Sequence, residues 1–510
     1  MSLSKTPASW QTHLPPGSTY DASAAGAGTP VGVWQRHWAD EPERICLMDP
    51  LGNGLTWRQF EEGSRKKAEQ LHAAGLRAGQ RVLCSSESSL EGILAHAACL
   101  RLGAVALPTN TAYREAELAH VIGDARPSAA IVDQTQRADW IKKSDPGIKI
   151  FSPDMQTLQE IDSSVELDKV GPLDPALIGY TSGTTGRPKG AVLSHANLLA
   201  SVEALRLAWR WSAQDRLVLC LPLFHMHGLG VGLHGTLHAG GSAVVLAGFD
   251  PDVVFDSIEA HDATLFFGVP TLYHRLVDHP RVNELSRLRL CVSGSAPLPA
   301  ELHGQFEKAT GQRIVERYGM TETAMLVSNP TDGERRPGTV GLPLPGVEVR
   351  LRGEPAEIEV KGPNVFSGYW ERPDATAEAF TEDDFFRTGD LGEYDDAGYL
   401  RISGRAKELI ISGGYNVYPR EVEEAIRLHP DIEEAAVVGT ASPEWGESVT
   451  AYLVVRKDVP LDDLRSFLAK ELAPYKHPRI LYVVDRLPRN ALGKIQKHRL
   501  AAGQVLPDDE

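Results

Sequence analysis

The chain has 510 residues, of which 42% are hydrophobic and 24% charged, and these values are typical of a folded globular protein rather than a disordered one. Its length predicts about two to four domains. The formal net charge of −16 repels the phosphates of nucleic acids and anionic lipids, so neither is expected as a partner. An anionic substrate must therefore be bound by local cations or backbone N–H groups.

The cysteines and the N-terminal segment indicate where the protein works. The five cysteines are widely spaced and include no Cys-x-x-Cys pair, so neither a disulfide framework nor a zinc site is predicted. The first residues lack the basic start and apolar run of a signal peptide. The most apolar stretch, 217–224, is too short to span a bilayer. We expect a cytoplasmic protein without stable membrane insertion.

In chain order, short β-branched runs alternate with helical patterns, which predicts α/β layering. Strands are expected at residues 81–86, 104–108, 128–133, 176–182, 216–224, 242–249, 262–270 and 288–296. Helices are expected at residues 91–103, 271–279 and 299–310. Continuous apolar runs such as 288–292 are typical of parallel strands that are covered on both faces.

The composition changes near residue 330. Residues 333–370 are rich in Gly and Pro with short alternating runs, which predicts a β-rich subdomain. Later elements are expected at strand 408–412, helix 419–429, strands 433–439 and 450–456, helix 461–472 and strand 479–485. The predicted fold class is therefore α/β, with a large N-terminal domain (1–404) of layered sheets and a small α+β domain (405–510).

The most informative string is TSGTTGRPKG at residues 181–190, directly after a predicted strand. Its three glycines let backbone N–H groups turn inward, its four hydroxyl side chains add donors, and Lys189 supplies a positive charge. These features predict a polyphosphate site. The spacing differs from a Walker A loop, and composition alone leaves a flexible polar hairpin open as the alternative.

Further strings follow in order along the chain. They are GSAPL at 294–298, YGMTET at 318–323, TGDLG at 388–392, GRAKELIISGGYNVYPREVE at 404–423 and PRNALGKIQK at 488–497. Together with YTSGTTGRPKGAVLSH at 180–195, they resemble the motifs of the adenylate-forming (AMP-binding) superfamily. That superfamily includes acyl-CoA synthetases, adenylation domains of peptide synthetases and firefly-type luciferases. The resemblance covers nearly the whole chain.

The resemblance implies a two-step reaction that uses ATP, Mg²⁺ and, in most members, coenzyme A. A carboxylate attacks the α-phosphorus of ATP to give an acyl-adenylate and pyrophosphate, and a thiol then displaces AMP. Glu322 matches the family's magnesium ligand, because Mg²⁺ prefers a few protein oxygens together with phosphate oxygens. A carboxylate at a helix start is the structural alternative for Glu322.

The resemblance also implies a nucleotide site. Its expected members are Thr181, Ser182, Gly183, Thr184, Thr185, Lys189, Gly294, Ser295, Ala296, Glu316, Tyr318, Gly319, Thr321, Asp390, Arg405 and Lys494. Thr184 is expected to act in catalysis, Tyr318 to stack on adenine, and Asp390 to bind the ribose with support from Arg405. Taken singly, Asp390 is typical of a turn and Tyr318 of a core, so both roles rest on the resemblance.

Lys494 is the sharpest single-residue expectation. In the family, the matching lysine reaches the carboxylate and α-phosphate during adenylation, where a cation stabilises developing negative charge. Lys407 matches the family's hinge residue, and Gly413 and Gly414 would then line the thiol tunnel. The small domain is accordingly expected to be mobile.

Two arginines bear on which acid is activated. Arg275 and Arg317, with Ser295 and His225 nearby in their motifs, resemble the substrate site of malonyl-CoA synthetases. A buried second carboxylate requires paired cations, and guanidinium binds it in bidentate fashion. The alternatives are a surface position for Arg275 on an amphipathic helix and an ion pair of Arg317 with Glu316 or Asp390.

We therefore predict an acid–CoA ligase for a small dicarboxylate, malonate or methylmalonate, which differ by only one methyl group. Within enzymes, the alternatives are a short- or medium-chain or aryl acyl-CoA synthetase, or an enzyme that charges a carrier protein. Outside enzymes, the alternative is a nucleotide-binding sensor on the same fold. The sequence leaves the oligomeric state open.

Overall fold

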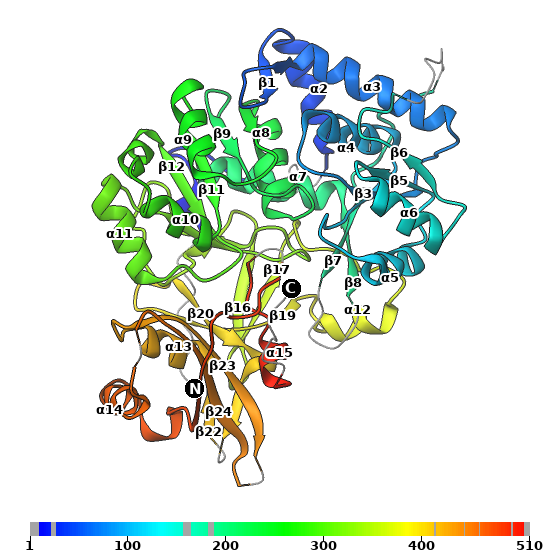
Figure 1. Ribbon diagram of the computed structural model, residues 1–510. Coiled ribbons are helices and arrows are strands. Elements are labelled where there is room, and N and C mark those ends of the chain that lie inside the picture. Colours follow the sequence, from blue (N-terminus) through cyan, green and yellow to red (C-terminus); the bar gives the residue numbers. More distant parts are fainter. Residues whose placement is uncertain are drawn as a thin grey trace. The chain divides into compact units, whose positions relative to one another are not determined.

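The computed structural model describes residues 10–21, 27–156, 165–181, 188–412, 415–442, 444–457, 459–490 and 493–503 (Figure 1). The chain divides into two compact units. The first comprises residues 1–349, 360–386 and 394–400, and the second comprises residues 350–359, 387–393 and 401–510. The division into functional domains after residue 404 stays a prediction.

A seven-stranded sheet in the first unit has the order β18-β8-β7-β4-β3-β5-β6. Its strands are β3 (Arg81–Ser85), β4 (Val105–Pro108), β5 (Ala129–Val132), β6 (Lys149–Phe151), β7 (Pro175–Thr181), β8 (Lys189–Ser194) and β18 (Gly368–Tyr369). Strands β3 to β6 run parallel, whereas β7 and β8 form an antiparallel hairpin. The predicted strand–helix–strand unit at 81–108 is confirmed.

Helices cover both faces of this sheet, because neighbouring residues of a strand point to opposite sides. Val82 of β3 packs with residues of α3 (Trp57–Ala73) and α4 (Leu90–Leu102), which lie side by side (Figure 1). Leu83 packs instead with α5 (Glu115–Ala125) and α6 (Thr135–Ser144).

A nine-stranded sheet completes the first unit, in the order β15-β14-β13-β12-β11-β9-β10-β1-β2. Its strands are β1 (Ile45–Met48), β2 (Gly54–Thr56), β9 (Arg216–Leu219), β10 (Ser242–Val245), β11 (Leu265–Gly268), β12 (Leu290–Ser293), β13 (Val315–Tyr318), β14 (Val327–Ser328) and β15 (Leu342–Pro343). Strands β9 to β13 run parallel to one another, whereas β13 pairs antiparallel with β14. Strand β12 is fully buried, as its apolar run predicts. The predicted strand 216–224 ends at Leu219, and Pro222 follows outside the sheet.

The first unit contains further helical segments. They are α2 (Pro30–Asp40), α7 (His195–Ala208), α8 (His234–Ala239), α9 (Pro251–Ala260), α10 (Pro270–Val277), α11 (Ala300–Thr310) and α12 (Pro373–Ala379), with the one-turn segments η1 (Trp10–His13) and η3 (Val282–Arg287) and the π-helix η2 (His227–Leu233). One face of the sheet packs against α9, α10 and α11 around Phe266 and Cys291. On the other face, Phe267 contacts the rings of Trp209 and Trp211.

Two sheets contribute residues to the second unit, a four-stranded sheet and a mixed sheet. The first of these sheets has the order β16 (Glu348–Arg352), β17 (Glu357–Lys361), β19 (Phe386–Tyr394), β20 (Leu400–Arg405). The mixed sheet has the order β22 (Tyr415–Val417), β21 (Ile410–Ser412), β24 (Gly446–Val455), β23 (Ile432–Ser442), with β25 (Ile480–Val483) also pairing with β24. The other elements are η4 (Ala406–Glu408), α13 (Pro419–Arg427), α14 (Leu461–Glu471), η5 (Pro474–Lys476) and α15 (Lys497–Ala501).

Alternation along β23 builds the core of this unit. Ala435 and Val437 pack with α13 and α14, whereas Ala436 and Val438 face Leu500 of α15. The α+β character predicted for the C-terminal region is confirmed.

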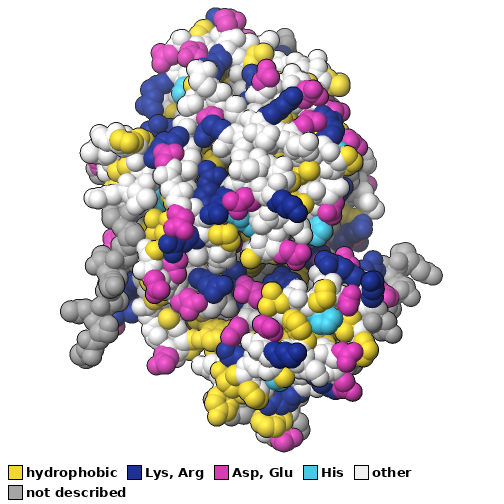
Figure 2. Space-filling model, turned by 90° about the vertical axis from the view of Figure 1, so that its left-hand side faces the viewer, with side chains coloured by type: hydrophobic (Ala, Val, Ile, Leu, Met, Phe, Trp, Pro, Cys, Tyr) yellow, Lys and Arg dark blue, Asp and Glu magenta, His cyan; other side chains and the backbone are white. Residues whose placement is uncertain are grey.

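On the face shown in Figure 2, Lys and Arg side chains are interspersed with Asp and Glu. Among the described residues, no helix is long and apolar enough to cross a membrane.

Candidate active site

The predicted polyphosphate string joins the two strands of the β7–β8 hairpin. Thr181 ends β7 and Lys189 begins β8, and these two residues are register partners across the ladder. Ser182, Gly183, Thr184 and Thr185 lie outside the described residues. What the structure describes is therefore the two ends of the string, which the antiparallel pairing holds side by side.

Glu322 lies beside the end of β7. It is 4% exposed, and its Oε1 accepts a hydrogen bond from the Tyr369 hydroxyl at 3.1 Å and lies 3.5 Å from the Thr181 hydroxyl. A Cβ on Gly179 would stand 2.4 Å from Cγ2 of Thr321, so glycine in β7 allows the 318–323 segment to pack this closely. A buried carboxylate and a hydroxyl therefore share one site.

Tyr369 links this carboxylate to Lys189. The Lys189 ammonium lies 5.3 Å from the centroid of the Tyr369 ring, a cation–π distance. Burial, and then the adjacent Glu322 charge, raise the pKa of Tyr369, so the phenol remains a donor to the carboxylate. Sequence reasoning missed Tyr369, because an aromatic residue in the string GYW carries no local sign of its partner 47 residues away.

Arg317 lies on β13, and its charged side chain is buried. The residue is 3% exposed, and its Nε and Nη2 atoms have no hydrogen-bond partner among the described residues. Burial lowers the pKa of its guanidinium to about 9. The predicted alternative of an ion pair with Glu316 is not among the ion pairs found in the described residues of the first unit, and Oε1 of Glu316 accepts from the Leu298 N–H. The alternative pairing with Asp390, a residue of the second unit, stays a prediction. An isolated buried cation is costly, so this arrangement is typical of a site that receives an anion.

The residues after β12 form the next wall of this site. The guanidinium carbon of Arg317 lies 2.5 Å from the position of a Cβ on Gly294, so a side chain there would have to displace the guanidinium. Ser295 adopts a left-handed backbone conformation with φ +69°, and its Oγ lies 3.3 Å from Nδ1 of His227. Ala296 follows and is half-buried.

His225 lies two residues before the π-helix η2, and His227 is its first residue. The backbone N–H of His227 donates to Nδ1 of His225 at 3.2 Å, and both residues belong to the turn after β9. Sequence reasoning missed His227 as a site residue, although its ring forms a hydrogen bond with Ser295. Single-turn π-helices occur frequently at functional sites, and a His-x-His string before three spaced glycines was the available signal.

Glu316, Tyr318 and Gly319 lie on or directly after β13. Oε1 of Glu316 accepts a hydrogen bond from the Leu298 N–H at 3.1 Å, which fixes the 294–298 turn. Tyr318 is 8% exposed at the carboxyl end of the strand. A Cβ on Gly319 would stand 2.0 Å from the Ala324 carbonyl oxygen. Glu316 therefore has an observed supporting role, whereas nucleotide contacts of all three remain predictions.

Arg275 is exposed on α10. The helix buries Pro270, Tyr273 and Leu276, a spacing of three that leaves residue 275 on the outward face. Its guanidinium lies 4.8 Å from the centroid of the Phe249 ring. These observations fit the surface alternative, and substrate binding by Arg275 stays a prediction without structural support.

The second unit holds the remaining predicted residues. Asp390 is 3% exposed and forms an ion pair with Nε of Arg405 at 2.9 Å, as the resemblance implies. Lys407 is exposed in η4, and Gly413 and Gly414 lie outside the described residues. Lys494 is exposed in a turn in which its N–H donates to Oδ1 of Asn490 at 3.0 Å.

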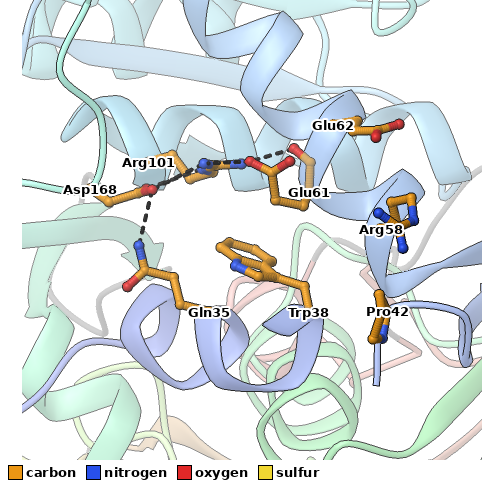
Figure 3. Close-up of a pocket in the computed structure, with 8 residues that line it drawn as sticks. All are labelled: Gln35, Trp38, Pro42, Arg58, Glu61, Glu62, Arg101 and Asp168. Atoms are coloured by element: carbon orange, nitrogen blue, oxygen red, sulfur yellow. Dashed lines mark hydrogen bonds and ion pairs between the residues drawn. The ribbon is translucent and has the colours of Figure 1, made fainter. Parts of the chain in front are cut away.

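A cavity of about 390 Å³ lies among α2, α3 and α4, and none of the residues described above lines it. Figure 3 shows Arg101 between the carboxylates of Asp168 and Glu61, with Trp38 of α2 facing it. Because the Arg101 guanidinium is already paired with these two carboxylates, it is not free to pair with an anionic substrate. It is not the candidate active site.

The family models agree with the motifs. The model described as AMP-binding enzyme matches residues 34–370, and the model described as AMP-binding enzyme C-terminal domain matches residues 421–494. The chain belongs to the AMP-binding enzyme family, which confirms the predicted resemblance. It is an AMP-forming acid–thiol ligase of the acyl-CoA synthetase class.

Individual relatives extend this result. The chain is 36% identical to the mitochondrial malonate–CoA ligase ACSF3 of Mus musculus, over 90% of this chain and 88% of that protein. It is 36% identical to a sulfoacetate–CoA ligase of Cupriavidus necator, over 92% and 96%. The crystal structure of ATP-bound MatB from Rhodopseudomonas palustris matches with a TM-score of 0.87 and 39% identity, over 94% of this chain and 99% of that one. Since one relative is mitochondrial, the cytoplasmic location of this chain stays a prediction.

Proposed function

We propose that the protein is an ATP-dependent malonate–CoA ligase, with methylmalonate as a further substrate. The observation that carries this proposal is Arg317, a buried guanidinium whose Nε and Nη2 atoms have no hydrogen-bond partner among the described residues. Malonate brings a second carboxylate that would pair with this cation. Sulfoacetate, the acid named for one relative, also carries a second anionic group opposite its carboxylate.

In this proposal, one carboxylate of malonate is held by Arg317 and by the Ser295 hydroxyl, which His227 orients. The free carboxylate then attacks the α-phosphorus of ATP, and pyrophosphate leaves. In the second step, the thiol of coenzyme A attacks the acyl carbon of the adenylate, and AMP leaves. His225 borders the acid site through its contact with His227.

The triphosphate would be held by Thr181, Lys189 and the loop between them, in which Thr184 acts in catalysis. Glu322 and Thr181 supply hard oxygen donors that fit Mg²⁺, which prefers one or two protein oxygens together with phosphate oxygens. The bound ion would neutralise charge on the phosphate oxygens. Among the described residues, no cage of three or more metal-ligating side chains competes with this arrangement.

The second unit would supply Asp390 to the ribose and Lys494 to the developing charge of the first step. Lys407 would act as the hinge between the proposed domains 1–404 and 405–510, and Gly413 and Gly414 would line the path of the thiol. A substitution K494A should therefore slow adenylation, measured as malonate-dependent exchange of pyrophosphate into ATP. It should change the reaction of supplied malonyl-adenylate with coenzyme A much less.

The thiol and the acid class are tested together. Malonate with coenzyme A should release pyrophosphate and AMP. Octanoate or ferulate in place of malonate should support little turnover, and so should a holo-carrier protein in place of coenzyme A. Higher turnover of octanoate or ferulate than of malonate would assign the enzyme to the alternative acyl-CoA synthetases. Transfer to the carrier protein in preference to coenzyme A would assign it to the carrier-charging enzymes.

A further inference from the structure

Helix α5 presents two polar side chains toward the ends of the β7–β8 hairpin. Its buried residues Leu118, Val121 and Ala125 belong to the core beneath the sheet. His120 and Asp124 are four residues apart and therefore lie on one face of the helix.

His120 contacts the residue that precedes Lys189. Its Nε2 lies 2.9 Å from the carbonyl oxygen of Pro188. A carbonyl oxygen only accepts, so Nε2 carries the hydrogen and donates it. Its ring also packs edge-on against Tyr180, with the centroids 6.3 Å apart and the planes at 84°. His120 thus touches residues next to both ends of the 181–189 string.

Asp124 contacts the residue that precedes Thr181. Its side chain is 9% exposed, and Oδ2 accepts a hydrogen bond from the Tyr180 hydroxyl at 2.8 Å. Its other oxygen pairs with Arg372. Burial, and then the hydrogen bond to Asp124, raise the pKa of Tyr180, so the hydroxyl stays protonated and the bond persists at physiological pH.

The same helix also holds the segment that carries Tyr369. Asp124 pairs with Arg372, and Arg126, the C-cap residue directly after the helix, pairs with Glu371. Directly before these residues, the Trp370 N–H donates to the Gly190 carbonyl at 2.7 Å, next to Lys189. One helix therefore contacts all three segments that bring Thr181, Lys189 and Tyr369 together.

We propose that His120 and Asp124 are positioning residues for ATP, which set the separation of Thr181 and Lys189 through Pro188 and Tyr180. Neither residue needs to touch the nucleotide. A site that is held in its binding geometry loses less entropy when the ligand binds. The inference rests on the proposed role of Thr181 and Lys189 in binding the triphosphate.

The test compares H120L with H120Q. Leucine removes the Nε2 donor, whereas the glutamine amide places a donor near the same point. H120L should raise KM for ATP about five- to tenfold and leave KM for the acid unchanged, and H120Q should restore most of the loss. Y180F, which removes only the hydrogen bond to Asp124, should act in the same direction without disturbing His120.

The matched control is H261L, because Nε2 of His261 also donates to a proline carbonyl, that of Pro50, at 3.0 Å. Affinity for a non-hydrolysable ATP analogue, titrated without acid, separates this inference from the identity of the substrate. A selective loss of that affinity in H120L and Y180F, at unchanged melting temperature, supports the inference even if malonate is not turned over. Equal effects of H120L and H261L, or no rescue by H120Q, would overturn it.

Discussion

The guanidinium carbon of Arg317 lies 2.5 Å from the position that a Cβ atom would occupy on Gly294. A side chain at residue 294 would therefore have to displace the guanidinium from its observed position beside the end of β12. The contact places the guanidinium beside the residue that precedes Ser295, and the proposed acid site depends on it.

The substitution G294A tests this packing. We expect the added methyl group to displace the guanidinium and raise KM for malonate at least about tenfold, because misplacement of a binding group is costly. G304A is the control, since a Cβ on Gly304 would meet nothing within 4 Å. Equal KM values for malonate in both variants would contradict the assigned position of the cation.

Replacing Arg317 by methionine should separate substrate binding from stability. R317M should lose at least about a hundredfold in kcat/KM for malonate, because an interaction between two charges is removed from a buried site. Its melting temperature should be equal to or higher than that of the wild type, since an isolated buried cation is destabilising. The exposed Arg275 provides the control, and R275M should retain malonate turnover. A large loss in R275M would restore that arginine to the substrate site.

Glu322 and Tyr369 should act through the metal. E322Q should slow adenylation by at least about a hundredfold and raise the Mg²⁺ concentration needed for half-maximal rate, because a neutral amide holds the ion weakly. Y369F removes only the donor to the carboxylate, so it should shift the Mg²⁺ dependence less. Pyrophosphate exchange over a Mg²⁺ titration measures both effects. An unchanged Mg²⁺ dependence in E322Q would remove Glu322 as the ligand.

A buried cluster of histidines should make stability depend on pH. Nε2 of His96 and Nε2 of His234 are 2.9 Å apart, and burial, followed by repulsion from His195, lowers the pKa of His96 to about 4. Burial also lowers the pKa of His195 to about 4. The unfolded chain binds these protons near pH 6.5, whereas the folded chain does not. The free energy of unfolding is therefore highest above pH 6.5 and falls as the pH drops toward 4. Each such histidine lowers the free energy of unfolding by about 3 kcal/mol at pH 4.

Chemical denaturation at pH 7.5, 6 and 5 measures this loss. The double variant H96L/H234L should flatten the pH dependence relative to the wild type, because two of the groups that take up protons on unfolding are gone. An identical slope in both proteins would assign the acid sensitivity to other residues.

Much of the architecture was predictable, because each strand and helix follows a local pattern. The strand–helix–strand unit at 81–108 has its apolar run, the Ser89 cap and a terminating glycine, Gly103, at φ +78°. Arg317 was identified from its motif, but its burial and lack of a partner depend on packing from β12 and were visible only in three dimensions.

Other features could not be predicted from the sequence. The outward position of Arg275 depends on which face of the short helix α10 meets the core, and both its faces carry apolar residues. The assignment of residues 350–359 and 387–393 to the second unit depends on sheet pairing between distant strands. The hydrogen bonds of Tyr369, Tyr180 and His120 join residues far apart in the chain, so the local sequence around each residue does not predict its partner.

The most direct test of the account is the acid specificity of the wild-type enzyme. Pyrophosphate release is measured with ATP, Mg²⁺ and coenzyme A and a panel of malonate, methylmalonate, sulfoacetate, acetate and octanoate. The account predicts that the acids with a second anionic group are activated with much higher kcat/KM than acetate or octanoate, with malonate first, and that R317M abolishes this preference. Equal or higher kcat/KM with octanoate, or a preference for malonate that survives in R317M, would contradict it.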